Sequence, residues 1–109
     1  ILCRKYMWAH GELDIVARDG TALAFVEVKT RRRLYKGRPG DAVGASKRQN
    51  IIRGAHRYLR EIGSPSIPYR FDIVEVVLNR GLQDIRYHRN AFTEETARRA
   101  NGVFPSLNL

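Results

Sequence analysis

Alternating apolar and polar residues near the start of the chain predict a pair of antiparallel strands. The two β-prone runs occupy residues 12–18 and 22–29, and half-buried strands alternate in this way because successive side chains point to opposite faces. Between the runs stands Asp19-Gly20, a dipeptide typical of tight hairpin turns. We therefore expect a β-hairpin whose two turn residues are Asp19 and Gly20.

From residue 46 the hydrophobic period changes to that of an amphipathic helix. Its apolar positions are Ile51, Ile52, Ala55, Tyr58, Leu59 and Ile62. Ser46 and Gln49 have the spacing of a capping box, which predicts the helix start. Gly63 followed by Pro65 predicts its end.

The remaining segments complete a small α/β domain. Residues 30–45 hold three of the chain's nine glycines and several arginines, and predict a long exposed connection. Residues 69–78 predict a strand buried on both faces, and residues 83–88 predict a shorter strand. Thr93 can cap a last short helix through Arg99. The order β-β-α-β-β-α predicts a mixed sheet covered by helices.

Composition bounds the class of protein. The chain has 109 residues, 43% hydrophobic and 28% charged, which fits one globular domain over residues 1–109. No apolar run approaches the ~18 residues of a membrane span, so we expect no membrane partner. The single cysteine, Cys3, excludes an internal disulfide and suits a reducing compartment. We therefore expect a cytoplasmic protein.

Positive charge is concentrated in the middle third of the chain. The sequence carries 20 Lys and Arg against 11 Asp and Glu, a net charge of +9. Residues 29–60 hold eleven basic side chains and one acidic side chain, Asp41, and so account for the whole excess. A basic face kept for solubility is the plain alternative, but such a concentration favours nucleic acid as the partner.

Contacts to nucleic acid are expected from this basic segment. The candidates for phosphate contacts are Arg31, Arg32, Arg33, Lys47, Arg53 and Arg57. Lys47 lies at a helix start, where free backbone N–H groups also favour an anion, although a solvated first-turn lysine is an equal alternative. Upstream, Tyr6 and Trp8 suit stacking on bases, but packing of a first strand against the core explains them better.

Carboxylates converge on one face of the predicted hairpin. With the turn given above, Glu12 faces Glu27, and Asp14 lies diagonal to Glu27 at roughly 7–8 Å. Four polar side chains share this face: Glu12, Asp14, Glu27 and Lys29. Carboxylates this close repel, so a cation is needed, and Lys29 or a hard divalent ion such as Mg²⁺ meets that need. The structural alternative is a salt bridge from Lys29 to one carboxylate, with the others in solvent.

The order and spacing of these residues resemble a known nuclease signature. Asp14, followed across a hairpin by Glu27-Val28-Lys29, looks like the PD-(D/E)xK signature of restriction-endonuclease-like nucleases. More closely, residues 11–17 and 25–31 resemble the YraN-like family of small bacterial proteins, which are similar to archaeal Holliday junction resolvases. The similarity continues through residues 41–43, 47–48, 55, 58–59, 70–74 and 90–92. It implies a restriction-endonuclease-like mixed sheet flanked by helices and a metal-dependent endonuclease that acts on DNA, with branched DNA as a candidate substrate.

The resemblance also implies roles for individual residues. Asp14 and Glu27 would hold Mg²⁺ or Mn²⁺, with the Val28 carbonyl as a third ligand. Lys29 would orient or deprotonate the attacking water. Glu12 would assist as an outer ligand or orient a metal-bound water. By analogy with resolvases, which cut two strands, a homodimer is expected.

The N-terminus departs from the family pattern. Members usually begin with a helix before the first strand, whereas ten residues precede Gly11 here. We therefore expect that this helix is missing, together with an acidic residue that related resolvases take from it. This leaves a second hypothesis, a nucleic-acid-binding module that keeps the nuclease-like fold without hydrolysis.

Overall fold

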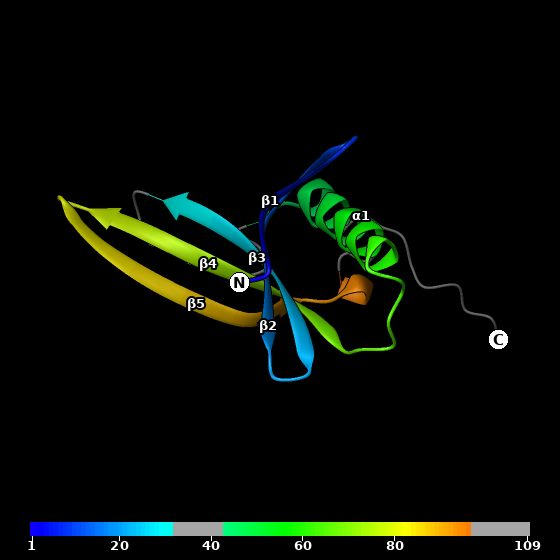
Figure 1. Cartoon of the computed structure of the whole chain (residues 1–109). Coiled ribbons are helices and arrows are strands. Elements are labelled where there is room, and N and C mark those ends of the chain that lie inside the picture. The colour runs from blue at the N-terminus through cyan, green and yellow to red at the C-terminus, as the bar shows by residue number, and fades with distance from the viewer. Residues whose placement is uncertain (32–42, 97–109) are drawn as a thin grey trace.

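One mixed sheet of five strands, covered on one face by a long helix, forms the frame of the protein (Figure 1). The computed structural model describes residues 1–31 and 43–96. The elements are β1 (Cys3–Trp8), β2 (Gly11–Asp19), β3 (Ala22–Arg31), α1 (Ala45–Glu61), β4 (Tyr69–Asn79) and β5 (Leu82–Phe92). Neighbours in the sheet follow the order β1-β2-β3-β4-β5; β3 and β4 run parallel and the other pairs antiparallel. The predicted mixed α/β architecture is confirmed, and it is compatible with a restriction-endonuclease-like fold.

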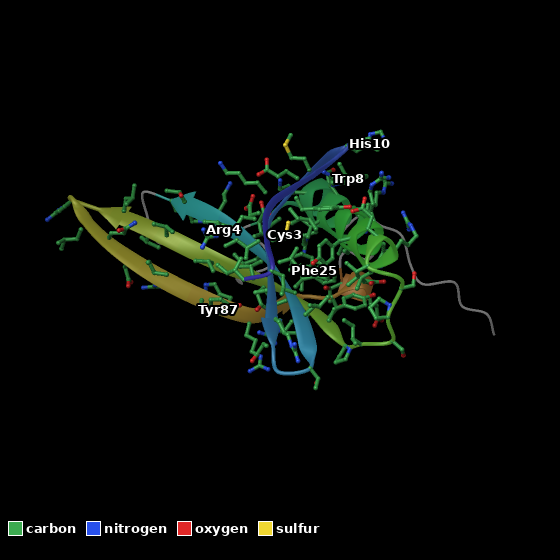
Figure 2. All side chains as sticks on the ribbon, in the orientation of Figure 1. Cys3, Arg4, Trp8, His10, Phe25 and Tyr87 are labelled. Carbon is green, nitrogen blue, oxygen red and sulfur yellow. The ribbon has the colours of Figure 1, made fainter. Side chains whose placement is uncertain are left out.

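The parallel step between β3 and β4 explains the position of α1. Parallel neighbours need a crossover connection, usually a helix that packs on one face of the sheet. α1 buries Ile51 and Ile52 in this way. Beneath the helix lies Phe25 (Figure 2), which stacks on Phe71 with ring centroids 5.8 Å apart. Phe71 in turn stacks on Phe92 at 5.1 Å. The core therefore lies between α1 and the sheet.

α1 begins one residue earlier than predicted, and Ser46 does not cap it. The N-cap residue is Gly44, whose carbonyl accepts a hydrogen bond from the Arg48 N–H at 2.9 Å, and no side chain caps the helix. The capping-box prediction was wrong because Ser46 already lies within the first turn. The predicted end is confirmed. Gly63 follows the C-cap residue with a φ of +94°, a conformation that glycine adopts without strain.

β1 adds a strand ahead of the predicted hairpin, so the described order is β-β-β-α-β-β. Tyr6 of β1 packs edge-on against Tyr58 of α1, with ring centroids 5.3 Å apart, as expected of a first strand packed on the core. At the other end, Thr93 Oγ1 accepts the Thr96 N–H at 3.1 Å. Thr93 thus caps a helical turn as predicted, while residues 97–99 lie outside the described part of the chain.

β4 is buried on both faces only over part of its length. Residues 71–73 are buried consecutively, whereas burial alternates beyond them. Asp72 is fully buried, and its carboxylate accepts hydrogen bonds from Arg70 Nε at 3.1 Å and from the Asn90 N–H at 2.8 Å. β5 extends well beyond the predicted range 83–88.

The predicted connection over residues 30–45 can be assessed only at its ends. Residues 30 and 31 belong to β3. At the other end, Val43 is buried in the core. The rest of that prediction lies outside the described residues. No helix within residues 1–31 and 43–96 is long and apolar enough to cross a membrane.

The turn of the β2–β3 hairpin falls one residue later than predicted. Asp19 pairs with Ala22, so Gly20 and Thr21 form the turn, and Gly20 has a φ of +59°. The predicted turn was wrong because Asp19 still belongs to the ladder, and the pairing is therefore shifted by two residues. In a regular strand such a shift leaves each side chain on its predicted face, since side chains alternate with a period of two.

A buried glycine in α1 lets β1 and β2 approach the helix closely. A Cβ at Gly54 would lie 2.8 Å from Trp8 Nε1 and 3.1 Å from Leu13 Cδ2. On an exposed helix surface, glycine to alanine stabilises by roughly 1 kcal/mol. We expect Gly54→Ala instead to lower the melting temperature, because the new methyl group must displace an indole ring and a core leucine. Thermal unfolding followed by circular dichroism measures the change.

Ser46→Ala is the matched control in the same helix. Ser46 is exposed and caps nothing, so alanine should leave the melting temperature unchanged or slightly raised. A Gly54→Ala protein that is more stable than the parent would contradict the packing described above. A loss of about 1 kcal/mol in Ser46→Ala would restore Ser46 as the cap.

Candidate active site

The sheet divides at Asp14. The pairing of β2 with β3 ends at Ile15 opposite Val26. Beyond this point β2 continues beside β1, while β3 continues beside β4 (Figure 1). The β1–β2 register also omits the pair of Lys5 and Asp14, and Lys5 has a φ of +51°. Asp14 therefore interrupts both ladders of β2.

This interruption reverses the faces of β2. Leu13 and Val16 are both buried in the core, although residues three apart in a regular strand point to opposite faces. Glu12 consequently lies on the face away from α1, where it pairs with Met7 and lines a cavity of about 400 Å³. The prediction that Glu12 faces Glu27 was wrong, because the register is shifted and the alternation breaks at Asp14.

The carboxylate of Asp14 bonds to the edge of β3. Its Oδ2 accepts a hydrogen bond from the Val28 N–H at 2.9 Å. In an extended strand the N–H and C=O of one residue point to the same edge, so the Val28 carbonyl also opens toward Asp14. Asp14 and Val28 both line the 400 Å³ cavity. The division of the sheet thus places a carboxylate and a backbone carbonyl side by side at an accessible edge.

Glu27 is a buried carboxylate that contacts Asp14. Only 8% of Glu27 is exposed, and the Lys47 Nζ atom near the start of α1 lies 3.4 Å from its Oε1. Burial, and after it the negative charge of Asp14, raise the pKa of Glu27 to about 7, while the Lys47 ammonium acts in the opposite direction. Two carboxylates close enough to interact in this way can share one proton or one cation.

This set of oxygen atoms suits a hard divalent cation. Mg²⁺ binds through one or two carboxylates and keeps several waters, and carbonyl oxygens are also ligands for hard ions. Asp14, Glu27 and the Val28 carbonyl supply such a set, and burial together with the charge of Asp14 raises the pKa of Glu27 despite the nearby Lys47. Among the described residues, no three His, Cys, Asp or Glu side chains lie close enough to hold a metal together. A cation here would therefore depend on Val28 and water besides the two carboxylates.

Lys29 lies two residues beyond Glu27 on β3, with an exposed side chain, and its register partner on β4 is Glu75. Glu75 is only 5% exposed and was not predicted as a site residue. Its carboxylate lies 3.6 Å from Arg31 Nε and 2.9 Å from His88 Nε2, the latter without hydrogen-bond alignment. A single acidic residue between valines in an apolar strand was the signal that could have found it.

Of the predicted phosphate contacts that the structure describes, Lys47 lies apart from Arg53 and Arg57. Lys47 lies at the acidic site, whereas Arg53 and Arg57 lie exposed on α1. Between Lys47 and Arg53 the helix advances about 9 Å and turns through about 240°, so the two side chains leave it in different directions. Arg32 and Arg33 lie outside the described residues. Lys47 therefore belongs to the acidic site, whereas Arg53 and Arg57 belong to a separate face of α1.

These features define a mixed α/β protein with two carboxylates in contact where its sheet divides. The model of the Uncharacterised protein family UPF0102 matches residues 1–76, and the chain belongs to this family, which is the YraN-like family. No activity is stated in that description.

Relatives in several bacteria are similar over most of the chain. A UPF0102 protein of Symbiobacterium thermophilum is 49% identical over 76 residues, which cover 70% of this chain and 64% of the relative. One of Chlorobaculum tepidum is 46% identical over 77 residues, covering 71% and 60%. One of Nocardia farcinica is 44% identical over 91 residues, covering 84% and 72%. The chain thus spans less than two thirds of the length of the first two relatives.

The raised pKa of Glu27 predicts a pH-dependent stability. Between pH 4.5 and about 7, the folded protein holds a proton on Glu27 that the unfolded chain has lost, so the stability falls as the pH rises through this window. We expect Glu27→Gln to be more stable than the parent above pH 7, with a difference that shrinks toward pH 4.5. Thermal unfolding in EDTA across this range measures it.

Glu61→Gln serves as the control, because the carboxylate of Glu61 is exposed at the end of α1. The difference in melting temperature between Glu61→Gln and the parent should not grow as the pH rises from 4.5 to above 7. If the melting temperature of Glu27→Gln stays parallel to that of the parent at every pH, the raised pKa is wrong.

Proposed function

We propose that this protein is a metal-dependent endonuclease that hydrolyses phosphodiester bonds of DNA, with branched DNA as a candidate substrate. The observation that carries the proposal is that the Val28 N–H holds Asp14 at the edge of β3, close enough to the buried Glu27 for the two carboxylates to interact. Such a site offers few protein ligands to Mg²⁺ or Mn²⁺ and so leaves coordination positions for water and a phosphate oxygen.

The protein holds the two carboxylates in place from different elements. The Val28 N–H fixes one oxygen of Asp14 against β3. Lys47 restrains Glu27 from α1. Pre-positioned ligands of this kind need little rearrangement to bind a cation. A bound Mg²⁺ or Mn²⁺ supplies a nucleophile near neutral pH and offsets charge on the phosphate.

Two further side chains have roles that the PD-(D/E)xK resemblance implies. Lys29 extends from β3 with an exposed side chain and would orient or deprotonate the attacking water. Glu12 lines the same cavity as Asp14, which suits an outer ligand that acts through water.

Partner, compartment and assembly follow from the same proposal. A net charge of +9 supports a polyanionic substrate, which we take to be DNA. The lone cysteine supports a reducing cytoplasm. Cutting both strands of a branched molecule calls for two active sites, which a symmetric homodimer supplies.

A second candidate is a nucleic-acid-binding module that keeps this fold without hydrolysis. The observation that favours it is the shortage of acidic ligands, since in residues 1–31 and 43–96 no third such side chain joins Asp14 and Glu27. A module of this kind binds DNA through its basic side chains, with an affinity that falls steeply with salt. It forms no cleavage product with any metal.

Cleavage assays with labelled four-way junction, flap, duplex and single-stranded DNA in Mg²⁺ or Mn²⁺ test the proposal. We expect Asp14→Asn and Lys29→Ala each to lose at least roughly 100-fold in cleavage rate, the usual contribution of a ligand or general base, while binding DNA almost as the parent does. Glu12→Gln should lose roughly tenfold, because it acts through water.

Asp84→Asn is the matched control, an exposed carboxylate on β5 that should change nothing. Equal cleavage by the parent and by Asp14→Asn and Lys29→Ala would contradict the roles assigned to Asp14 and Lys29. Salt-dependent binding by the parent without any metal-dependent product would favour the binding module.

A further inference from the structure

A second concave site lies between the end of β1 and the exposed face of α1. It is a cavity of about 250 Å³, lined by Trp8, Arg53, His56, Arg57 and Arg60. Trp8 comes from β1 and lies over the helix (Figure 2), and the four basic side chains come from successive turns of α1. The carboxylates of the candidate active site do not line it.

The cavity carries an excess of positive charge. Within the described ranges of the chain, Arg53 and Arg60 form no ion pair. Arg57 lies 3.6 Å from Glu61, and both side chains are about half-exposed, so this pair offsets little. Guanidinium groups stay protonated at any physiological pH. Three of them around one small cavity favour the entry of an anion with several acceptor oxygens, such as a phosphate.

Trp8 supplies the aromatic wall of this cavity, and its packing fixes the ring. The Nε1 atom of Trp8 is buried against Gly54 of α1. The ring also meets the His10 ring edge-on, with centroids 5.4 Å apart. A fixed indole beside guanidinium groups is a combination that binds single-stranded nucleic acid, because the ring stacks on a base while the cations meet the backbone.

We propose that this cavity binds one unpaired nucleotide of a DNA strand, with its phosphate on the three arginines and its base against Trp8. A base exposes its face to a side chain only where it has left the stack of a duplex. The inference rests on the proposed function for its choice of DNA, and it names DNA with a single-stranded segment as the substrate class.

Trp8 is the only tryptophan of the chain, so its fluorescence reports on this cavity directly. The probe is a short single-stranded oligothymidylate, titrated into the full chain in EDTA so that no metal-dependent cleavage occurs. We expect the strand to quench Trp8. A duplex of the same length, and an abasic strand with the same phosphates, should require roughly 5- to 150-fold higher concentrations, the range that loss of one stacked base corresponds to. Inorganic phosphate should not quench.

The arginines are tested by the double variant Arg53→Gln/Arg60→Gln, in which both side chains are exposed and the fold is checked by circular dichroism. It should raise the Kd for the single strand by about tenfold or more, because two charge-assisted hydrogen bonds are lost. Arg80→Gln, at the tip of the β4–β5 hairpin far from α1 (Figure 1), is the matched control and should bind like the parent.

Equal quenching by the abasic strand or by inorganic phosphate overturns the inference, as does an unchanged Kd in the double variant. Asp14→Asn should be quenched like the parent. Intact quenching of Trp8 in a protein that cuts no DNA therefore overturns the nuclease proposal alone, whereas cleavage without quenching overturns only this nucleotide site.

Discussion

The hydrogen bond from the Val28 N–H to the Asp14 carboxylate is the contact on which the rest of the structure depends. β2 leaves the edge of β3 at this point, and a strand edge that loses its neighbour leaves backbone donors without partners, which costs free energy. A side-chain oxygen replaces the missing backbone carbonyl. The same break reverses the faces of β2, so that Leu13 and Val16 both enter the core, and it carries the β1–β2 hairpin across to α1. One interruption therefore creates both the acidic site and the end of the hairpin that bears Trp8.

Electrostatics and packing meet at the start of α1. The Lys47 ammonium near the start of α1 lies 3.4 Å from Glu27 Oε1 and favours its ionised form. Burial and the neighbouring carboxylate of Asp14 are stronger, because the pKa of Glu27 is nevertheless raised to about 7. The fold thus holds Glu27 beside Asp14 in a buried position where ionisation of Glu27 is unfavourable, even with Lys47 nearby. A structural salt bridge alone would not need the second carboxylate, which is why the arrangement favours a cation.

The sequence predicted the elements better than the relations between them. A register shift of two residues keeps the hydrophobic pattern intact, so only the turn residues could have revealed that Asp19 belongs to the ladder. The alternation of side chains placed Glu12 beside Glu27, but it assumes an unbroken strand, and the break at Asp14 depends on a tertiary hydrogen bond that no local pattern shows. Glu75 was not predicted because an acidic residue in a buried strand is ordinarily part of a structural ion pair. The closeness of Asp14 to Glu27 could be predicted from the sequence, because it depends on the spacing of the two residues across one short turn.

The acidic site and the cavity beside Trp8 are both connected to α1, the first through Lys47 and the second through Arg53. Asn50, between Lys47 and Arg53 on the helix, donates a hydrogen bond to the His10 carbonyl at 3.0 Å, and so ties the end of the β1–β2 hairpin to α1. Along the axis, Lys47 and Arg53 are separated by about 9 Å. Under the proposed function, a DNA molecule that engaged both sites would place an unpaired nucleotide at α1 and the phosphodiester bond to be cut beside Asp14. Uniform duplex does not offer that change of structure, whereas a junction, flap or other branch point does. The two proposals, which depend on different residues, thus agree on branched DNA as the substrate class to test.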